Sequence, residues 1–153
     1  MRSGTLPAPL CIGLGEACAI AGAEMADELA RLARLRDRLL VALRAALPDV
    51  VLNGAPTPRV AGNLNLGFPG IDGQALLEQL PELSLSLGSA CTSAALEPSY
   101  VLQALGVPDD LANGSIRIGL GRFTAEAEVD FAVDRLISSV RRLKAGRPAV
   151  VRA

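Results

Sequence analysis

A long helical segment is predicted over 10–47, and within it leucines recur every three or four positions from Leu29 to Leu43. Its length favours two consecutive helices, and Pro48 is expected to end the second. Pro7 and Pro9 disfavour an earlier start, so we expect residues 1–9 to form an extended lead. The apolar stripe consists of Leu29, Leu32, Leu35, Leu39 and Leu43, and the off-stripe arginines, expected on a solvated face, are Arg31, Arg34, Arg38 and Arg44. The first helix is apolar enough that we expect another domain to cover it.

From residue 48 onward the pattern changes to short strands that alternate with short helices. Period-two alternation is clearest at 63–68 and 115–120, and shorter strands are predicted at 50–52 and 83–87. Helices are predicted at 72–80, at 99–105 and from 124 toward 146, with Asp72, Ser99 and Thr124 as N-caps. We therefore expect a single α/β domain with a helical segment over 1–47, an α/β body of three or four strands over 48–146, and a frayed tail at 147–153.

Composition narrows the classes of function. The 153 residues carry a net charge of -1, which provides no field to attract nucleic acid or an anionic membrane. There is no histidine, and Lys144 is the only lysine, so histidine acid–base chemistry and histidine metal sites are excluded within this chain. For Cys11 and Cys18, packing is favoured over metal binding, and no metal site is predicted. We expect neither a secretory signal nor an apolar run that approaches the length of a membrane span, which predicts a cytoplasmic protein.

The third cysteine, Cys91, lies in a run of small polar residues between the predicted strand at 83–87 and the helix that follows Ser99. Such a run has little apolar surface to bury, so we expect a surface loop. Polar surroundings favour a reactive thiol, whereas a lone cysteine in a globular domain is often an inert small hydrophobic residue. The pattern alone leaves both roles open.

Five motifs occur in a fixed order along the chain. They are Arg2-Ser3-Gly4-Thr5-Leu6-Pro7, Gly88-Ser89-Ala90-Cys91-Thr92-Ser93, Leu96-Glu97-Pro98-Ser99-Tyr100-Val101-Leu102, Ser115-Ile116-Arg117-Ile118 and Leu120-Gly121-Arg122-Phe123-Thr124. Together they resemble the C-terminal part of NifS-type cysteine desulfurases, in the aminotransferase class V family. The resemblance implies the small C-terminal domain of a fold-type I enzyme that depends on pyridoxal phosphate. Such enzymes convert L-cysteine to L-alanine and keep the sulfur as a persulfide.

The resemblance also implies roles for individual residues. Cys91 would be the catalytic thiol that carries the persulfide. An arginine such as Arg117 in a core-type strand needs a partner for its charge, either an acidic residue of this domain or a substrate carboxylate. The resemblance favours a clamp on the α-carboxylate of cysteine. Thr5, otherwise a cap or turn residue, would reach the cofactor phosphate of a partner subunit in a homodimer. Arg122 has no such assignment and is expected to support the turn around it.

The large domain of this family, which would precede Arg2, is expected to be absent from this chain. It supplies the Schiff-base lysine, a histidine on the cofactor ring and an aspartate at the ring nitrogen, and Lys144 matches none of these. We therefore expect this chain alone neither to hold pyridoxal 5'-phosphate nor to turn over.

Two hypotheses follow from these motifs. In the first, the chain is part of a desulfurase that needs a cofactor domain and passes sulfur to an acceptor or iron–sulfur scaffold protein, or to tRNA thiolation. In the second, it is a stand-alone persulfide carrier or interaction module. Arg117 and Thr5 favour the first, because a simple carrier has no use for either.

Overall fold

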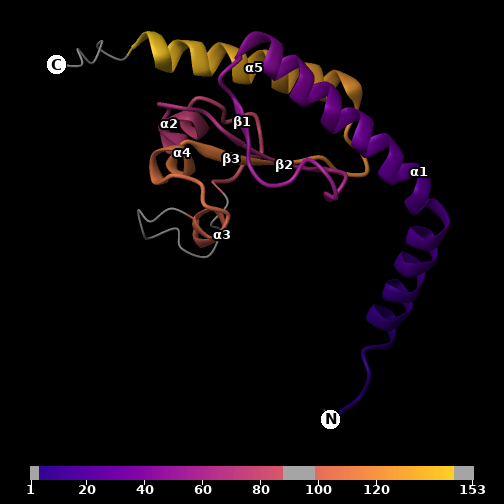
Figure 1. The fold of residues 1–153 in the computed structure, drawn as a ribbon. Helices are drawn as coiled ribbons and strands as arrows, with labels where there is room; N and C mark the ends of the chain where they lie inside the picture. Colours follow the sequence, from indigo (N-terminus) through magenta and orange to yellow (C-terminus); the bar gives the residue numbers. More distant parts are fainter. Residues whose placement is uncertain (1–3, 88–98, 147–153) are drawn as a thin grey trace.

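The computed structural model describes residues 4–87 and 99–146, and in this part three strands form one antiparallel sheet under two long helices (Figure 1). The strands are β1 (Val51–Leu52), β2 (Asn63–Gly67) and β3 (Ser115–Gly119), in the spatial order β1-β2-β3. The helices are α1 (Ala8–Ala46), α2 (Gly73–Glu78), α3 (Tyr100–Ala104), α4 (Asp109–Asn113) and α5 (Glu126–Ala145). The architecture is the α/β fold that the pattern predicts.

The N-terminal segment forms one continuous helix, so the expectation of two helices is wrong. The glycines within α1 lower helix stability by about 1 kcal/mol each without breaking the backbone ladder. The extended lead is also shorter than predicted, since α1 begins at Ala8 and includes Pro9. Proline is tolerated there because N–H groups of the first turn have no intrahelical acceptor. The helix ends at Ala46, just before Pro48, as expected.

The core contacts of α1 come from its C-terminal half. The stripe residues Leu32, Leu35, Leu39 and Leu43 are buried, whereas Leu29, predicted with them, is 44% exposed. Toward the N-terminus, Leu10, Ile12 and Leu14 are 73%, 73% and 67% exposed, and this half of the helix projects away from the sheet (Figure 1). Within the described residues this apolar surface is therefore uncovered, and the domain expected to cover it stays a prediction.

α1 is also, within the described residues, the one helix that could cross a membrane by length and composition. Its most apolar 18-residue window has a mean hydropathy of 1.3, and none of that window is buried. The expectation that no apolar run approaches the length of a span is therefore wrong. The finding is weak evidence for a span, because core helices and signal sequences meet the same criterion.

Alternation along β2 and β3 divides the sheet into two faces. Leu64 pairs with Ile118 and Leu66 with Ile116, and all four side chains are buried. They form one core with the buried leucines of α1, with Phe68, and with Val129, Val133, Leu136 and Val140 of α5. Directly opposed residues of an antiparallel pair share a face, so the intervening positions place Asn63, Asn65, Ser115 and Arg117 on the other side.

The short elements follow the predictions in part. Asp72 caps α2 as expected, since its carboxylate accepts the N–H of Ala75 at 2.8 Å. Ser99 occupies the N-cap position of α3 without a side-chain hydrogen bond. The strand predicted at 83–87 is reduced to a single bridge between Ser86 and Arg117. α4 was not predicted, because its sequence Asp109–Asn113 contains a single large apolar residue and so shows no helical spacing.

The last helix begins later than the sequence suggests. Its N-cap is Ala125, and the hydroxyl of Thr124, predicted to cap it, instead accepts the N–H of Gly121 at 2.9 Å. The Glu128 carboxylate accepts the N–H of Ala125 at 2.8 Å, so an acidic side chain within the first turn replaces the expected cap.

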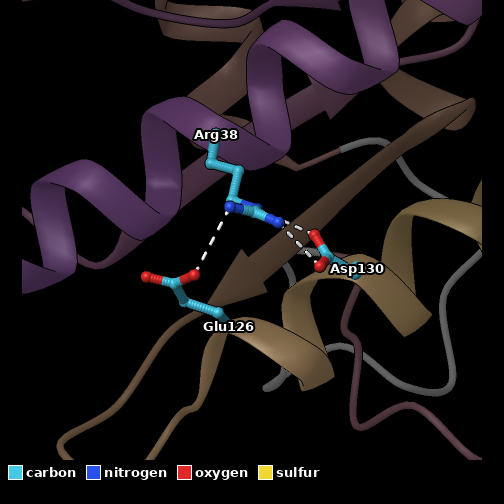
Figure 2. Close-up of polar contacts among 3 residues, drawn as sticks. All are labelled: Arg38, Glu126 and Asp130. Atoms are coloured by element: carbon cyan, nitrogen blue, oxygen red, sulfur yellow. Dashed lines mark hydrogen bonds and ion pairs between the residues drawn. The ribbon is translucent and has the colours of Figure 1, made fainter.

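Two of the off-stripe arginines tie α1 to the C-terminal part of the chain. Figure 2 shows Arg38 reaching from α1 to α5, where Nε and Nη2 contact the two Asp130 oxygens at 2.8 and 2.7 Å, and Nη1 contacts Glu126 at 3.4 Å. Arg31 donates to the carbonyls of Arg122 and Thr124 at 2.5 and 2.7 Å. The expectation of a solvated face is therefore confirmed for Arg34 and Arg44, which are exposed. It is incomplete for Arg31 and Arg38, because their side chains also bind groups of the C-terminal part.

Truncating a leucine at the centre of the core should destabilise the fold strongly. Leu39 is fully buried, so Leu39→Ala is expected to lower the free energy of unfolding by about 2–5 kcal/mol. The matched control is Val41→Ala on the same helix, where the side chain is 68% exposed and the change should be within about 0.5 kcal/mol. Denaturant titrations measure both, and equal losses would contradict the packing described for α1.

The pairing of α1 with α5 should weaken in acid. The hydrogen bond from Arg38 is the main cause that lowers the pKa of Asp130 and raises that of Arg38. A carboxyl whose pKa is lower in the folded state stabilises the fold above its unfolded pKa, and this contribution disappears as pH falls through the folded pKa. Asp130→Asn should therefore lower Tm by about 2 °C at pH 7 and leave it unchanged well below pH 4. Asp134→Asn, on the same helix, is the control, and a gap in Tm that persists at low pH would refute the assignment.

Candidate functional site

The face of the sheet opposite the core carries a row of polar residues. The backbone N–H of Asn53, just after β1, donates to the carbonyl of Asn65 at 2.9 Å, and Asn65 lies opposite Arg117 in the β2–β3 register. Arg117 in turn bridges Ser86. The row Asn53–Asn65–Arg117–Ser86 therefore crosses the sheet at right angles to its strands, and we call it the polar row.

Arg117 is exposed although its neighbours Ile116 and Ile118 are buried. The expectation that the Arg117 charge is buried in a core-type strand is wrong. Successive side chains of a strand point to opposite faces, and Arg117 points to the face opposite the core. No acidic residue in the described part of the chain forms an ion pair with it, so the first of its two predicted partners is not observed there. Beside it on the same face, a Cβ added to Gly119 would meet no atom within 4 Å. Within the described part of the chain, the sheet face beside Arg117 is therefore uncovered at Gly119.

Ser86 connects Arg117 to the segment that contains Cys91. The backbone N–H of Arg117 donates to the Ser86 carbonyl at 2.6 Å, and the Ser86 N–H donates back at 3.3 Å. The Nη2 atom of Arg117 also donates to the Ser86 hydroxyl at 3.2 Å. Cys91 itself lies outside the described residues, so its predicted place in a surface loop stays a prediction.

A buried hydrogen-bond chain supports the polar row from below. Asn53 Nδ2 donates to Asn65 Oδ1 at 2.7 Å and to Ser115 Oγ at 2.8 Å, and Ser115 Oγ donates to the Leu111 carbonyl at 2.7 Å. Ser115 is fully buried and Asn53 is 5% exposed. Sequence reasoning missed these residues. The available signal was the alternation of Asn63 and Asn65 with leucines, which marks a polar sheet face but not its partners.

Arg59 closes the end of the row next to Asn53. Its guanidinium donates to the carbonyls of Asn53, Ala55 and Asn63 at 2.7, 3.0 and 3.4 Å. Burial is the main cause that lowers the pKa of Arg59, with a smaller contribution from Arg36. A surface cavity of about 250 Å³ lies beside it, lined in part by Pro58 and Val60. Each guanidinium nitrogen of Arg59 donates to one of these carbonyls, so this side chain holds the loop in place.

The remaining candidate residues lie away from the polar row. Thr5 is exposed, in the segment before α1, beyond the end of the helix that projects from the sheet (Figure 1). Cys11 and Cys18 are exposed on the same half of α1, so the packing role favoured for them is not observed within the described structure. Arg122 forms ion pairs with Glu24 and Glu28 of α1, in agreement with its expected role in supporting the turn.

The described residues do not form a site for pyridoxal phosphate. The chain has one lysine, Lys144, which lies near the C-terminal end of α5. Its Nζ atom pairs with Asp49 and is not part of the polar row. There is no histidine to stack on the cofactor ring. The described residues also contain no cluster of three or more histidine, cysteine, aspartate or glutamate side chains that could hold a metal ion. What the polar row can do is bind an anionic group at Arg117.

Comparisons with known proteins identify relatives for nearly the whole chain. Over 148 residues it is 51% identical to a cysteine desulfurase of Homo sapiens, which covers 97% of this chain and 32% of the relative. It is 49% identical to cysteine desulfurase IscS of Ehrlichia chaffeensis, over 97% of this chain and 36% of that protein. The chain thus spans about a third of the length of the curated relatives it matches.

Solved structures support the same relationship. A NifS-like protein superposes with a TM-score of 0.79 at 26% identity, covering 93% of this chain and 36% of that one. The NifS-like protein of Rickettsia africae shares the fold, with a TM-score of 0.75. The sequence profile of the aminotransferase class-V family matches residues 1–131. These matches confirm the resemblance to cysteine desulfurases, and the chain belongs to the aminotransferase class-V family, whose members in general depend on pyridoxal phosphate.

Proposed function

We propose that this chain is the substrate-clamping and sulfur-accepting part of a cysteine desulfurase, which converts L-cysteine to L-alanine and a persulfide on Cys91. The observation that carries the proposal is Arg117, an exposed guanidinium on an open polar face, hydrogen-bonded to Ser86. Identity of about half to curated cysteine desulfurases supports the reaction class.

Arg117 suits the α-carboxylate of an amino acid. A guanidinium presents two parallel donors that match the two oxygens of a carboxylate, and such charge-assisted pairs are the stronger hydrogen bonds. The residue is held on a sheet strand rather than on a loop, which fixes the position of the clamp. One hydrogen bond to Ser86 orients the side chain and leaves other donors of the guanidinium available to a ligand.

Cys91 follows Ser86 by five residues, so the connecting backbone can span at most about 18 Å. We propose that this short connection lets the thiol reach a substrate held at the carboxylate clamp. In the proposed reaction the Cys91 thiolate forms a bond to the substrate sulfur while the carbon–sulfur bond of cysteine breaks. The carbon keeps the bonding electron pair and takes up a proton, which gives L-alanine.

The lysine and the ring partners that the cofactor needs have to come from residues other than those described. We propose that the larger part of the family fold holds it and covers the exposed apolar half of α1, where Leu10 and Ile12 are each 73% exposed. Thr5 lies beyond that half of the helix, and we propose that its hydroxyl binds a cofactor phosphate in a homodimer. The persulfide then passes to a sulfur-acceptor or iron–sulfur scaffold protein.

Replacing the thiol should abolish sulfur transfer. In the native polypeptide, or in this chain combined with a cofactor-binding part, Cys91→Ser is expected to reduce persulfide formation to background because the nucleophile is removed. Mass spectrometry of the protein after exposure to L-cysteine detects the gain of one sulfur atom. Cys11→Ser and Cys18→Ser, both exposed on α1, are the controls and should keep the wild-type persulfide. Persulfide that persists in Cys91→Ser would refute the proposal.

Removing the clamp should weaken substrate binding. Arg117→Ala is expected to raise KM for L-cysteine about 10- to 100-fold, the effect of losing hydrogen bonds to a charged group. Arg117→Lys keeps the charge but loses the paired donors, so its KM should be intermediate. Arg142→Ala, an exposed arginine on α5, is the matched control. Alanine release at varied L-cysteine concentrations gives the values, and an unchanged KM in Arg117→Ala would overturn the clamp.

A further inference from the structure

In the buried hydrogen-bond chain beneath the polar row, the Leu111 carbonyl determines which group donates and which accepts at every step. A carbonyl only accepts, so the 2.7 Å contact from Ser115 Oγ uses the single hydroxyl proton of that serine. Ser115 Oγ can then only accept from Asn53, and the 2.8 Å contact must come from the amide nitrogen, Nδ2. The orientation of the Asn53 amide follows from this.

Asn53 in turn sets the orientation of Asn65. Because Asn53 Nδ2 is also the atom that faces Asn65 at 2.7 Å, the facing atom of Asn65 must be its oxygen. The NH₂ group of Asn65 therefore points away from Asn53. Among the described residues, nothing accepts a hydrogen bond from this group. The other side-chain groups of the network, from Asn53 through Ser115 to the Leu111 carbonyl, are all hydrogen-bonded.

The free NH₂ group lies beside the guanidinium proposed as the clamp. Asn65 and Arg117 are directly opposed in the register, and opposed residues share a face with Cβ atoms about 4.5–5.5 Å apart. Asn65 is half-buried and Arg117 is exposed, so one donor is held firmly and the other reaches outward. The open space over Gly119 adjoins both, since Gly119 follows Arg117 by two residues on the same face.

We propose that Asn65 donates a hydrogen bond from Nδ2 to the same substrate carboxylate that Arg117 binds, with Asn53 and Ser115 as the residues that position its amide. This inference rests on the proposed desulfurase function. A carboxylate has about four lone-pair sites, and a guanidinium that approaches one edge leaves sites for a second donor. A neutral donor in a fixed orientation sets the direction of the carboxylate without adding charge to the site.

The test uses Asn65→Asp in the active polypeptide. Aspartate keeps an oxygen that accepts from Asn53, so the buried chain stays intact, and it replaces only the outward NH₂ group with an acceptor. We expect the Tm to stay within a few degrees of wild type and KM for L-cysteine to rise more than about 10-fold. Asn65→Ala should raise KM less than Asn65→Asp, because it removes the donor without adding a repelling charge.

L-Cysteinamide is the matched substrate, since it lacks the carboxylate. Its KM should be unchanged or lower in Asn65→Asp, because the new carboxylate can accept from the substrate amide. Equal rises in KM for L-cysteine and L-cysteinamide would show general damage to the site and overturn the inference. An unchanged KM for L-cysteine would overturn it as well, even where Arg117→Ala raises that KM and so upholds the proposed clamp.

A second measurement does not depend on turnover. The side-chain NH₂ resonances of Asn65 should shift when L-alanine, which carries the same carboxylate, is added to the wild-type protein, and should shift less with alaninamide. Failure of Cys91 to form a persulfide would refute the proposed function, whereas failure of the Asn65 resonances to respond to L-alanine would refute this inference. Asn53→Ala tests positioning, with an expected rise in KM for L-cysteine and none for L-cysteinamide.

Discussion

The antiparallel register between β2 and β3 determines both what is buried and what is presented to a ligand. Leu64 and Leu66 face the core only because they lie opposite Ile118 and Ile116, and Asn65 faces Arg117 by the same register. A slip of one residue would move the leucines to the open face and the asparagines under the helices. The register is therefore held from two sides, by the apolar core and by the hydrogen-bond chain that ends at the Leu111 carbonyl.

The features predicted correctly from the sequence are those that depend on local periodicity. The leucine spacing identified the buried stripe Leu32–Leu43, alternation identified β2 and β3, and the Asp72 cap follows from a single side chain and its own turn. Some wrong predictions were local, such as the expected break in α1 and the Thr124 cap, whereas others depend on contacts between distant residues. The pairing of Arg38 with Asp130 joins positions 92 apart, and no property of either residue alone indicates its partner.

In the candidate site too, some residues could be identified from the sequence and others could not. Arg117 was identified from its motif, but its exposure depends on which sheet face the helices cover, and this is a property of the assembled layers. Asn53, Asn65 and Ser115 come from three strand regions, and they form one network only after the sheet has paired. A short strand contains few residues, so the sequence between its turns carries little information about the partners of its polar face.

The proposed sulfur transfer makes two different structural demands, one on the carboxylate clamp and one on the thiol. Binding a carboxylate in a defined orientation requires donors that do not move, and β2 and β3 provide them on strands joined by a full backbone ladder. Delivering a thiol to an acceptor requires a segment that few contacts restrain, and residues 88–93 are small and polar in sequence. Ser86 connects the two parts. It is hydrogen-bonded to Arg117, and the segment that contains Cys91 follows it directly in the sequence. Under the proposed function, the substrate carboxylate would be held on the two central strands, and the thiol would be carried by the segment that follows Ser86.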